Sequence, residues 1–329
     1  MNESVPIHHG GFTLTEMLVS MAVLASLVLL ISQILNGATA TITKGRKGID
    51  ADTEARIVFD RMAIDMSRIV RRNDTDFYGK DTSAGTNRPM TGNDQIAFYS
   101  DVRGYYTDSN PTPTATPTRN QRNPISLVGY AISNDPSGRP QLARLAKGLT
   151  WESTGGWQGI AHLPIQIISR WPNVFQASTP SSPTYNGMVD ADFEVISDSV
   201  LRLEYCYLLP PTSATSAAPS TVPYNNSLTG RSTADFCTDV IAIVVAIAIL
   251  DPSSRVIVND YSQLTSAGLF PDVPGSDAIT PNATATDIAK SWMTVINQPT
   301  FATNASIPMS AASSVRVYQR RFSFTGATD

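Results

Sequence analysis

The strongest constraint on the fold is an uncharged apolar stretch near the N-terminus, residues 17–35 (MLVSMAVLASLVLLISQIL). Counted from Phe12, a helix over this stretch is roughly 36 Å long at about 1.5 Å per residue, enough to cross a hydrocarbon layer of ~30 Å. A cleaved secretory signal has a shorter apolar region preceded by basic residues, whereas residues 1–11 contain no Lys or Arg. We therefore predict that residues 12–35 form a membrane-spanning helix.

Glu16 lies at the head of this otherwise apolar segment. An unpaired carboxylate inside a bilayer costs about 2.5 to 3.5 kcal/mol even on a lenient scale, so it requires a partner or a function. One interpretation is that Glu16 is interfacial and stabilises the helix N-terminus through the macrodipole. A second interpretation depends on the residues around it.

The string GGFTLTEMLV (residues 10–19) resembles the class III signal of type IV pilins and type II secretion pseudopilins. The resemblance implies that residues 1–11 are a leader, that prepilin peptidase cuts between Gly11 and Phe12, and that Phe12 becomes a methylated N-terminus. It also implies that Glu16 of one subunit pairs with the Phe12 amine of its neighbour. An ammonium group made by cleavage neutralises a carboxylate that has no other partner in the membrane.

The segment that follows, residues 36–72, is free of proline and amphipathic. Apolar residues such as Ala55, Phe59 and Met66 recur at helical intervals, and charged residues such as Asp65 and Arg68 fall on the other faces. We predict one long helix whose second half packs against a globular domain. Its glycines at positions 37, 45 and 48 predict a bend or a locally melted turn.

Residues 79–329 are predicted to form a globular β-rich domain, because their apolar runs are rich in β-branched and aromatic residues. The predicted strands are residues 95–100, 126–133, 141–145, 200–208, 239–250 and 315–324. In Val240–Leu250, large residues alternate with smaller ones, which predicts a central strand covered on both faces. Three insertions rich in Pro, Ser and Thr interrupt the domain, at residues 106–124, 210–234 and 271–286. The predicted fold class is α+β, a long N-terminal helix packed on an antiparallel β-sheet domain, which the resemblance makes pilin-like.

Two cysteines, Cys206 and Cys237, flank the second insertion. In an oxidising compartment a disulfide between them would stabilise the fold by about 3 to 4 kcal/mol on the chain-entropy model. The alternative is that both are small buried apolar residues. The disulfide prediction therefore depends on export of the domain.

Composition and motifs argue against several classes of function. The charged fraction is 16%, below the usual ~25%, and the net charge is −4, so we expect no nucleic-acid partner. The sequence has three histidines and lacks the motifs H-E-x-x-H, G-x-S-x-G, C-x-x-C and the P-loop. We predict that the protein is not an enzyme and has no cofactor. Calcium is the weakest expectation, because loops such as Asn134-Asp135 do not match a known cage.

More of the chain agrees with one branch of the pilin superfamily. Residues 52–72 (DTEARIVFDRMAIDMSRIVRR), 128–133 (VGYAIS) and 200–208 (VLRLEYCYL) resemble the larger minor pseudopilins, namely the J-type subunit of type II secretion and the PilW-like pilins. The ending VRVYQRRF (residues 315–322) is similar to verrucomicrobial cassette protein C, a pseudopilin-like family. The resemblance implies a minor subunit at or near a filament tip.

The resemblance to minor pseudopilins also implies where the protein is located and which partners it has. The protein would cross the bacterial inner membrane once, with its C-terminal domain in the periplasm. Its partners would be other pilins or pseudopilins, prepilin peptidase, the inner-membrane assembly platform and membrane lipid. The residues leave open a second hypothesis, a single-span membrane-anchored envelope binding protein that is not part of a filament. An envelope enzyme is the third.

Overall fold

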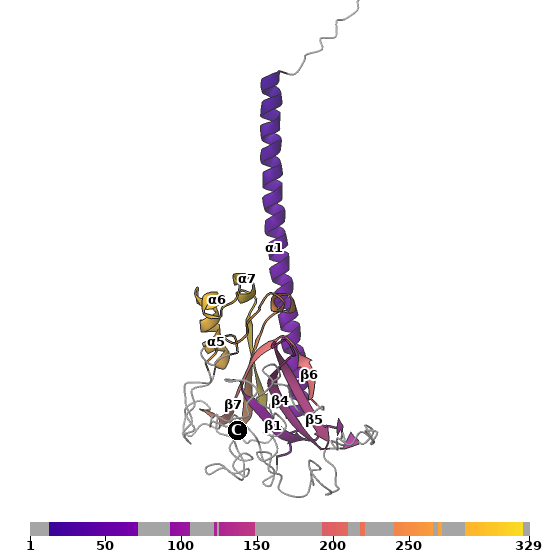
Figure 1. Cartoon of the computed structure of the whole chain (residues 1–329). Helices are drawn as coiled ribbons and strands as arrows, with labels where there is room; N and C mark the ends of the chain where they lie inside the picture. Colours follow the sequence, from indigo (N-terminus) through magenta and orange to yellow (C-terminus); the bar gives the residue numbers. More distant parts are fainter. Residues whose placement is uncertain are drawn as a thin grey trace, which may run out of the picture. The chain divides into compact units, whose positions relative to one another are not determined.

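The computed structural model describes residues 13–71, 93–105, 122–123, 125–148, 193–209, 218–220, 240–265, 269–271 and 287–324. The chain divides into two units, Met1–Lys47 and Gly48–Asp329. Helix α1 (Leu14–Met66) supplies the described part of the first unit and continues into the second (Figure 1). The fold is the predicted one, a long N-terminal helix with antiparallel sheets in a mixed α+β chain.

In the first unit, every described side chain from Thr13 to Arg46 is exposed. Among the described residues, α1 contains the one stretch that is long and apolar enough to cross a membrane. Exposed apolar side chains are favourable in lipid, so this segment fits a membrane-anchored, single-pass protein. The chain is helical throughout residues 37–48, and the melted turn predicted there is wrong.

In the second unit, α1 buries one face made of Ala51, Ala55, Val58, Phe59 and Met62. This is the predicted apolar face, and the prediction of a docked second half is confirmed. The helix ends at Met66, however, rather than at the predicted residue 72.

Strand β1 (Gln95–Ser100) explains where the helix stops. The Ser100 hydroxyl donates hydrogen bonds to the carbonyl oxygens of Asp65, at 2.8 Å, and Arg68, at 3.2 Å. The Val70 amide donates to the Tyr99 carbonyl at 2.8 Å. These backbone groups therefore form hydrogen bonds with β1 instead of with a further helical turn, and the helix ends here.

The first sheet has six strands: β1, β2 (Gly104–Tyr105), β3 (Arg122–Asn123), β4 (Ser126–Asn134), β5 (Pro140–Gly148) and β6 (Phe193–Ser197). Its centre is an antiparallel arrangement in which β4 pairs with β1 and β5, and β6 pairs with β5. The β4–β5 turn is closed by Asp135, whose Oδ1 accepts hydrogen bonds from the amides of Ser137 and Arg139, both at 2.8 Å. Side-chain to backbone hydrogen bonds of this kind are typical of aspartate in a tight turn, and they join β4 and β5 into a hairpin.

The second sheet has four strands in the order β10 (Arg316–Ser323), β9 (Ala242–Ile249), β7 (Val200–Leu209) and β8 (Ala218–Ser220). Side chains link it to the first sheet at the start of β1. Asn93 Oδ1 accepts from the Leu203 amide at 2.9 Å, and Asp94 Oδ2 accepts from the Tyr205 amide at 3.0 Å. The Asp94 amide in turn donates to the Leu203 carbonyl at 3.0 Å.

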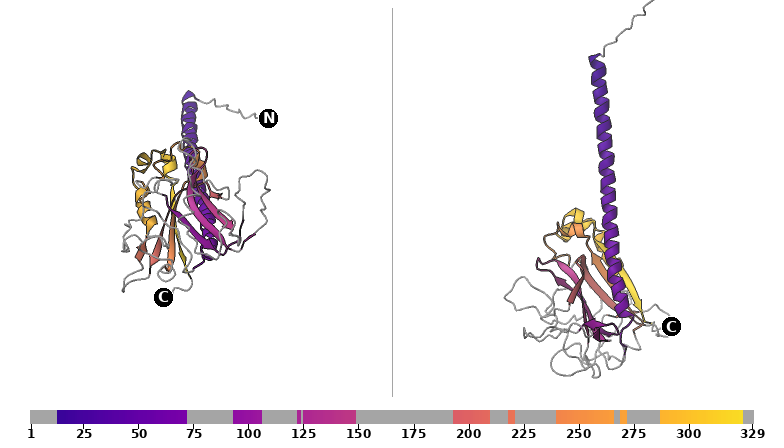
Figure 2. Two further views of the ribbon diagram at one scale, coloured as in Figure 1. Left: turned by 60° about the horizontal axis from the view of Figure 1, so that its bottom comes forward. Right: turned by 90° about the vertical axis from the view of Figure 1, so that its right-hand side faces the viewer.

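Strand β9 is the predicted central strand, since all of its residues are buried between β10 and β7. Ile243 and Ile247 face the core shared with α1, whereas Ala246 and Ala248 face a second core. The second core is closed by α4 (Pro252–Arg255), α5 (Ile288–Ile296), α6 (Phe301–Asn304) and α7 (Met309–Ala312), which the sequence analysis did not predict. Helices α5–α7 and the Gly48–Met66 part of α1 lie on opposite sides of the second sheet (Figures 1 and 2).

The predicted insertions fall mostly outside the described residues. Strand β3 belongs to the first of them and β8 to the second, so short pieces of both insertions join the sheets. Cys237 also lies outside the described residues, and the disulfide with Cys206 stays a prediction.

Trp292 on α5 provides a test of the second core. Its side chain is fully buried, lies edge-on to Phe270 with ring centroids 5.4 Å apart, and donates from Nε1 to the Pro271 carbonyl at 2.9 Å. We expect Trp292→Ala to lower the free energy of unfolding by about 3–5 kcal/mol and the melting temperature of the purified full chain by roughly 10 °C. The neighbouring Met293→Ala, at a 44% exposed residue, should have little effect. Equal melting temperatures for the two variants would contradict the buried position of Trp292.

Candidate functional site

Helix α1 begins with a reciprocal pair of hydrogen bonds between Thr13 and Glu16. The Thr13 amide and hydroxyl both donate to Glu16 Oε2, each at 2.9 Å, and the Glu16 amide donates to Thr13 Oγ1 at 3.3 Å. The Thr13 carbonyl accepts the first bond of the helix, from the Met17 amide at 3.2 Å. Thr-Leu-Thr-Glu is therefore a capping box, with threonine at the N-cap and glutamate at the third helical position.

The capping box gives Glu16 partners within its own chain. Two donors converge on Oε2, whereas Oε1 accepts no hydrogen bond from the described residues. The geometry agrees with the interpretation that Glu16 stabilises the helix N-terminus. It also leaves one carboxylate oxygen open to a positive group. Gly11 and Phe12 lie outside the described residues, so the cleavage position and the Phe12 amine stay predictions.

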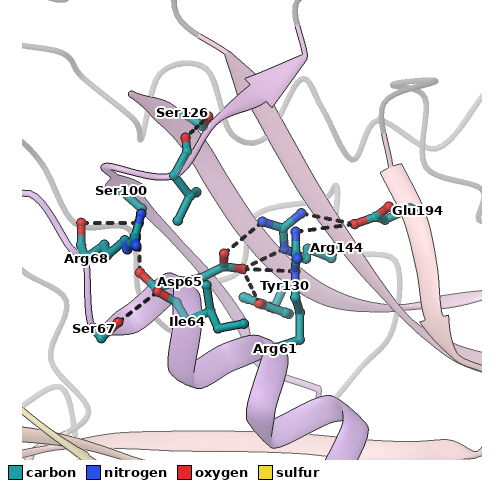
Figure 3. Close-up of polar contacts among 11 residues, drawn as sticks. Arg61, Ile64, Asp65, Ser67, Arg68, Ser100, Ser126, Tyr130, Arg144 and Glu194 are labelled. Atoms are coloured by element: carbon teal, nitrogen blue, oxygen red, sulfur yellow. Dashed lines mark hydrogen bonds and ion pairs between the residues drawn. The ribbon is translucent and has the colours of Figure 1, made fainter. Parts of the chain in front are cut away.

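At the other end of α1, a buried ionic cluster fixes the helix to the first sheet (Figure 3). Arg144 on β5 donates from Nε to Asp65 Oδ2 at 2.6 Å and from Nη2 to Asp65 Oδ1 at 2.8 Å, which is a bidentate pair. The Tyr130 hydroxyl on β4 donates to the same Oδ2. Arg144 also donates from Nη1 to Glu194 on β6 at 3.0 Å.

The ionic cluster is buried, and burial affects the protonation of its members. The side chains of Asp65 and Arg144 are 1% and 2% exposed, so neither charge is solvated by water. Burial, followed by the charge of Asp65, raises the pKa of the Tyr130 phenol, which therefore stays protonated and donates. Burial is the largest single effect on the pKa of Arg144 and acts to lower it, but the hydrogen bonds to Asp65, the charge of Asp65 and the contact with Tyr130 together outweigh burial and raise this pKa. Removing one partner would leave a buried unpaired charge, which is costly.

More exposed contacts join the same helix to other strands. The Tyr318 hydroxyl on β10 donates to Asp52 at 2.6 Å, and Arg320 donates to Asp60 at 2.7 Å. Ser197 of β6 donates to Glu54 at 2.9 Å. The Arg320–Asp60 contact is an exposed ion pair, and such pairs contribute only about 0–1 kcal/mol, so it adds little to the stability of the docked helix.

The helical periodicity of residues 52–72 predicted that Asp65 lies on a polar face with Arg68, and this interpretation is wrong, because Asp65 is fully buried. The sequence of β5 contained a signal that pointed to a buried carboxylate. Its sequence QLARL puts an arginine among apolar residues of a predicted strand, and a buried guanidinium requires a carboxylate. Tyr130, in the apolar β4 strand, carried the same kind of signal through its hydroxyl.

The predicted disulfide partner Cys206 and the candidate calcium loop at Asn134-Asp135 are not part of these two sites. Cys206 is buried on β7. At the Asn134-Asp135 turn, Arg255 lies 3.6 Å from Asp135 and 3.0 Å from Asp198, so an arginine supplies positive charge there. Within the described residues, no group of three His, Cys, Asp or Glu side chains is placed to hold a metal ion.

Comparison with protein families matches residues 8–32 to the prokaryotic N-terminal methylation motif. The matched segment contains the predicted cleavage position, the Thr13–Glu16 capping box and most of the apolar span. It therefore supports a type IV pilin-like protein with a prepilin-type signal. No curated protein matches the chain.

The buried cluster predicts unequal effects for two aspartates of α1. Asp65→Asn should lower the free energy of unfolding by about 3–5 kcal/mol, because the buried Arg144 would lose its buried counter-charge and keep only the exposed carboxylate of Glu194. Asp60→Asn, which breaks the exposed pair with Arg320, should cost less than about 1 kcal/mol. Denaturant titration of the full chain measures both, and hydrogen exchange should rise over residues 48–66 in Asp65→Asn alone. Similar losses in the two variants would show that the cluster does not hold the helix.

Proposed function

We propose that the chain is a minor pseudopilin or pilin-like structural subunit that assembles through its N-terminal helix into a type II secretion or type IV pilus-like filament. The observation that carries the proposal is the methylation motif at residues 8–32, which leads directly into an exposed apolar helix with one carboxylate at its head. We call the second unit, Gly48–Asp329, the head domain, or head. In this proposal the head domain contacts other subunits or cargo and has no catalytic role.

Processing would begin at the membrane. Prepilin peptidase would cleave between Gly11 and Phe12, and the new amine of Phe12 would be methylated. The proposal places the chain in a bacterial inner membrane, with the C-terminal domain in the periplasm before assembly. The assembly platform in that membrane and other pilins or pseudopilins would then be its partners.

Glu16 would then serve assembly as well as capping. Its Oε2 is engaged by Thr13, and its Oε1 is open among the described residues, so one carboxylate can close the helix and bind a neighbouring subunit's Phe12 amine. An ion pair in a medium of low dielectric constant is far stronger than in water, which suits a contact that sets the position of one subunit on the next.

A position at or near the tip follows from the size of the head. Two sheets and a layer of short helices accompany α1 in the second unit. Identical copies of a bulky head are harder to pack closely along a filament than copies of a small one. The resemblance to J-type pseudopilins and PilW-like pilins supports the same position.

The first test is the N-terminus of the native protein. Intact-mass and N-terminal analysis of membrane-extracted protein should show loss of residues 1–11 and a methylated Phe12. Retention of the leader would reject the proposal and favour the alternative, a single-span envelope binding protein. The control is Gly11→Val in the same host, which should keep the leader because the peptidase would no longer accept the site.

The second test separates capping from charge pairing at Glu16. Glutamine also serves at the third position of a capping box, so Glu16→Gln keeps the cap and removes the charge. We expect Glu16→Gln and Glu16→Ala to insert into the membrane, to be cleaved, and to be lost from isolated filaments or subunit complexes by at least about tenfold, equivalent to about 1.4 kcal/mol. Normal co-assembly of Glu16→Gln would overturn the pairing role and leave Glu16 with the cap alone.

A further inference from the structure

Basic residues follow directly after the apolar part of α1. No charged residue lies between Glu16 and Lys44 in the sequence, and Arg46 and Lys47 come immediately afterwards. The side chains of Lys44 and Arg46 are exposed, and we call these two residues the basic pair. Glu16 is the one acidic residue that the structure describes in the first unit, and it stands at the far end of the uncharged segment. The described residues of this unit therefore provide no carboxylate near the basic pair.

The uncharged part of α1 is as long as a whole bilayer is thick. Residues 17–43 are helical, and at about 1.5 Å per residue they extend for roughly 40 Å. A bilayer is about 40–45 Å thick when its headgroup layers are counted together with the ~30 Å hydrocarbon core. A helix that crosses the bilayer with this segment therefore places Glu16 in one headgroup layer and the basic pair in the other.

The threonines at the end of the uncharged segment are compatible with this span. The hydroxyls of Thr39, Thr41 and Thr43 each donate to the backbone carbonyl four residues earlier, at 2.8, 2.9 and 2.9 Å. A hydroxyl that is already bonded to the helix backbone costs less to remove from water than one without a partner. The first charged side chains after the span are those of the basic pair.

The sign of the charges changes just beyond the basic residues. Asp50, Asp52 and Glu54 follow Lys47 in the sequence, with no basic residue among them. An anionic surface attracts the basic residues and repels the acidic ones, and both effects fall off within a Debye length of about 8–10 Å. This order of charges therefore favours an anionic surface that meets α1 at the basic pair and stops before Asp50.

The positions of Lys44 and Arg46 around the helix distinguish a lipid layer from other anions. Two residues at about 100° each separate them by roughly 200°, so they lie on opposite sides of α1. Both cannot bind one small anion such as free phosphate, and both cannot face one flat partner protein. Headgroups, in contrast, surround a membrane-spanning helix on every side. Arginine binds phosphate oxygens through its planar fork, and lysine binds them as a point charge.

We propose that Lys44 and Arg46 bind the phosphate groups of anionic phospholipids, in the leaflet at the C-terminal end of the span. This inference rests on the proposed function for the location of the chain in a membrane, and it specifies the lipid class that contacts the subunit before assembly. The proposed orientation puts the basic pair on the non-cytoplasmic side, whereas basic residues beside a span are usually cytoplasmic. Lipid binding gives these residues a function on that side, because it fixes how deeply the unassembled subunit is inserted.

Photochemical cross-linking of the full chain tests the lipid contact. The chain is reconstituted in vesicles of equal parts phosphatidylglycerol and phosphatidylcholine, with a benzophenone amino acid in place of Thr43. Mass spectrometry should show at least about fivefold more adduct with phosphatidylglycerol than with phosphatidylcholine, because each basic residue near an anionic surface contributes about that factor. The same group in place of Leu27, which is 51% exposed in the apolar span, reports that the helix is inserted and should react with both lipids.

Variants assign the lipid preference to the basic pair. Lys44→Gln combined with Arg46→Gln should bring the ratio of the two adducts at position 43 close to one. The matched control, Arg56→Gln combined with Arg68→Gln, removes two exposed arginines later in α1 and should keep the preference. Inorganic phosphate at the concentration of the lipid phosphate should not change the ratio, and loss of the preference in its presence would indicate a free-anion site and overturn the proposal.

The position 27 adduct separates failure of this inference from failure of the proposed function. Equal adducts of the two lipids at position 43 in the unchanged chain, or no adduct there, would reject lipid binding by the basic pair. With normal adducts at position 27 and a cleaved leader, the proposed function would still stand. A chain that forms no lipid adduct at position 27 and keeps its leader would reject both. A preference that survives in the Lys44→Gln, Arg46→Gln variant would also overturn the assignment to these residues.

Discussion

The arrangement of the second unit depends on a carboxylate that water cannot reach. Asp65 is held by both nitrogens of the Arg144 fork and by Tyr130, so its oxygens are satisfied only when α1 lies against β4 and β5. Apolar contacts of Ala51, Ala55 and Met62 tolerate small rotations of a helix, whereas a bidentate pair does not. The cluster therefore fixes the rotation of this part of α1, and with it the face that is turned to the sheets and the face that is left outside.

Glu16 is the opposite case at the beginning of the same helix. Its donors come from Thr13, three residues away, and the side chain is exposed. A carboxylate satisfied by local contacts constrains nothing beyond the first turn, so it stays available for a partner. The contrast separates two uses of an acidic residue in this chain. Asp65 finds its hydrogen-bond partners on the first sheet and serves the fold, whereas Glu16 Oε1 accepts no hydrogen bond from the described residues, which agrees with the assembly role proposed for Glu16.

Local patterns predicted the parts of the fold that local chemistry determines. β1, β4, β7 and β9 are runs of β-branched and aromatic residues, and the Asp135 turn and the apolar face of α1 follow from short-range rules. The parts that were missed depend on contacts far apart in sequence. The hydrogen bonds of Ser100 set the end of α1, and the ion pair with Arg144 keeps Asp65 buried. Helices α5–α7 are stabilised by packing on the alanine face of β9. The capping box is a short-range pattern of the same kind, since threonine and glutamate stand three residues apart in Thr-Leu-Thr-Glu.

In the second unit, helix α1 carries apolar residues on more than one face. Between Gly48 and Met66, α1 presents small and aromatic residues to its own sheets and isoleucines away from them. Burial against the sheets accounts for the first set alone. The cluster at Asp65 prevents the helix from turning its isoleucines inward, because that rotation would carry Asp65 away from Arg144. The exposed isoleucines are therefore kept outside by the same interaction that holds this part of α1 to the first sheet.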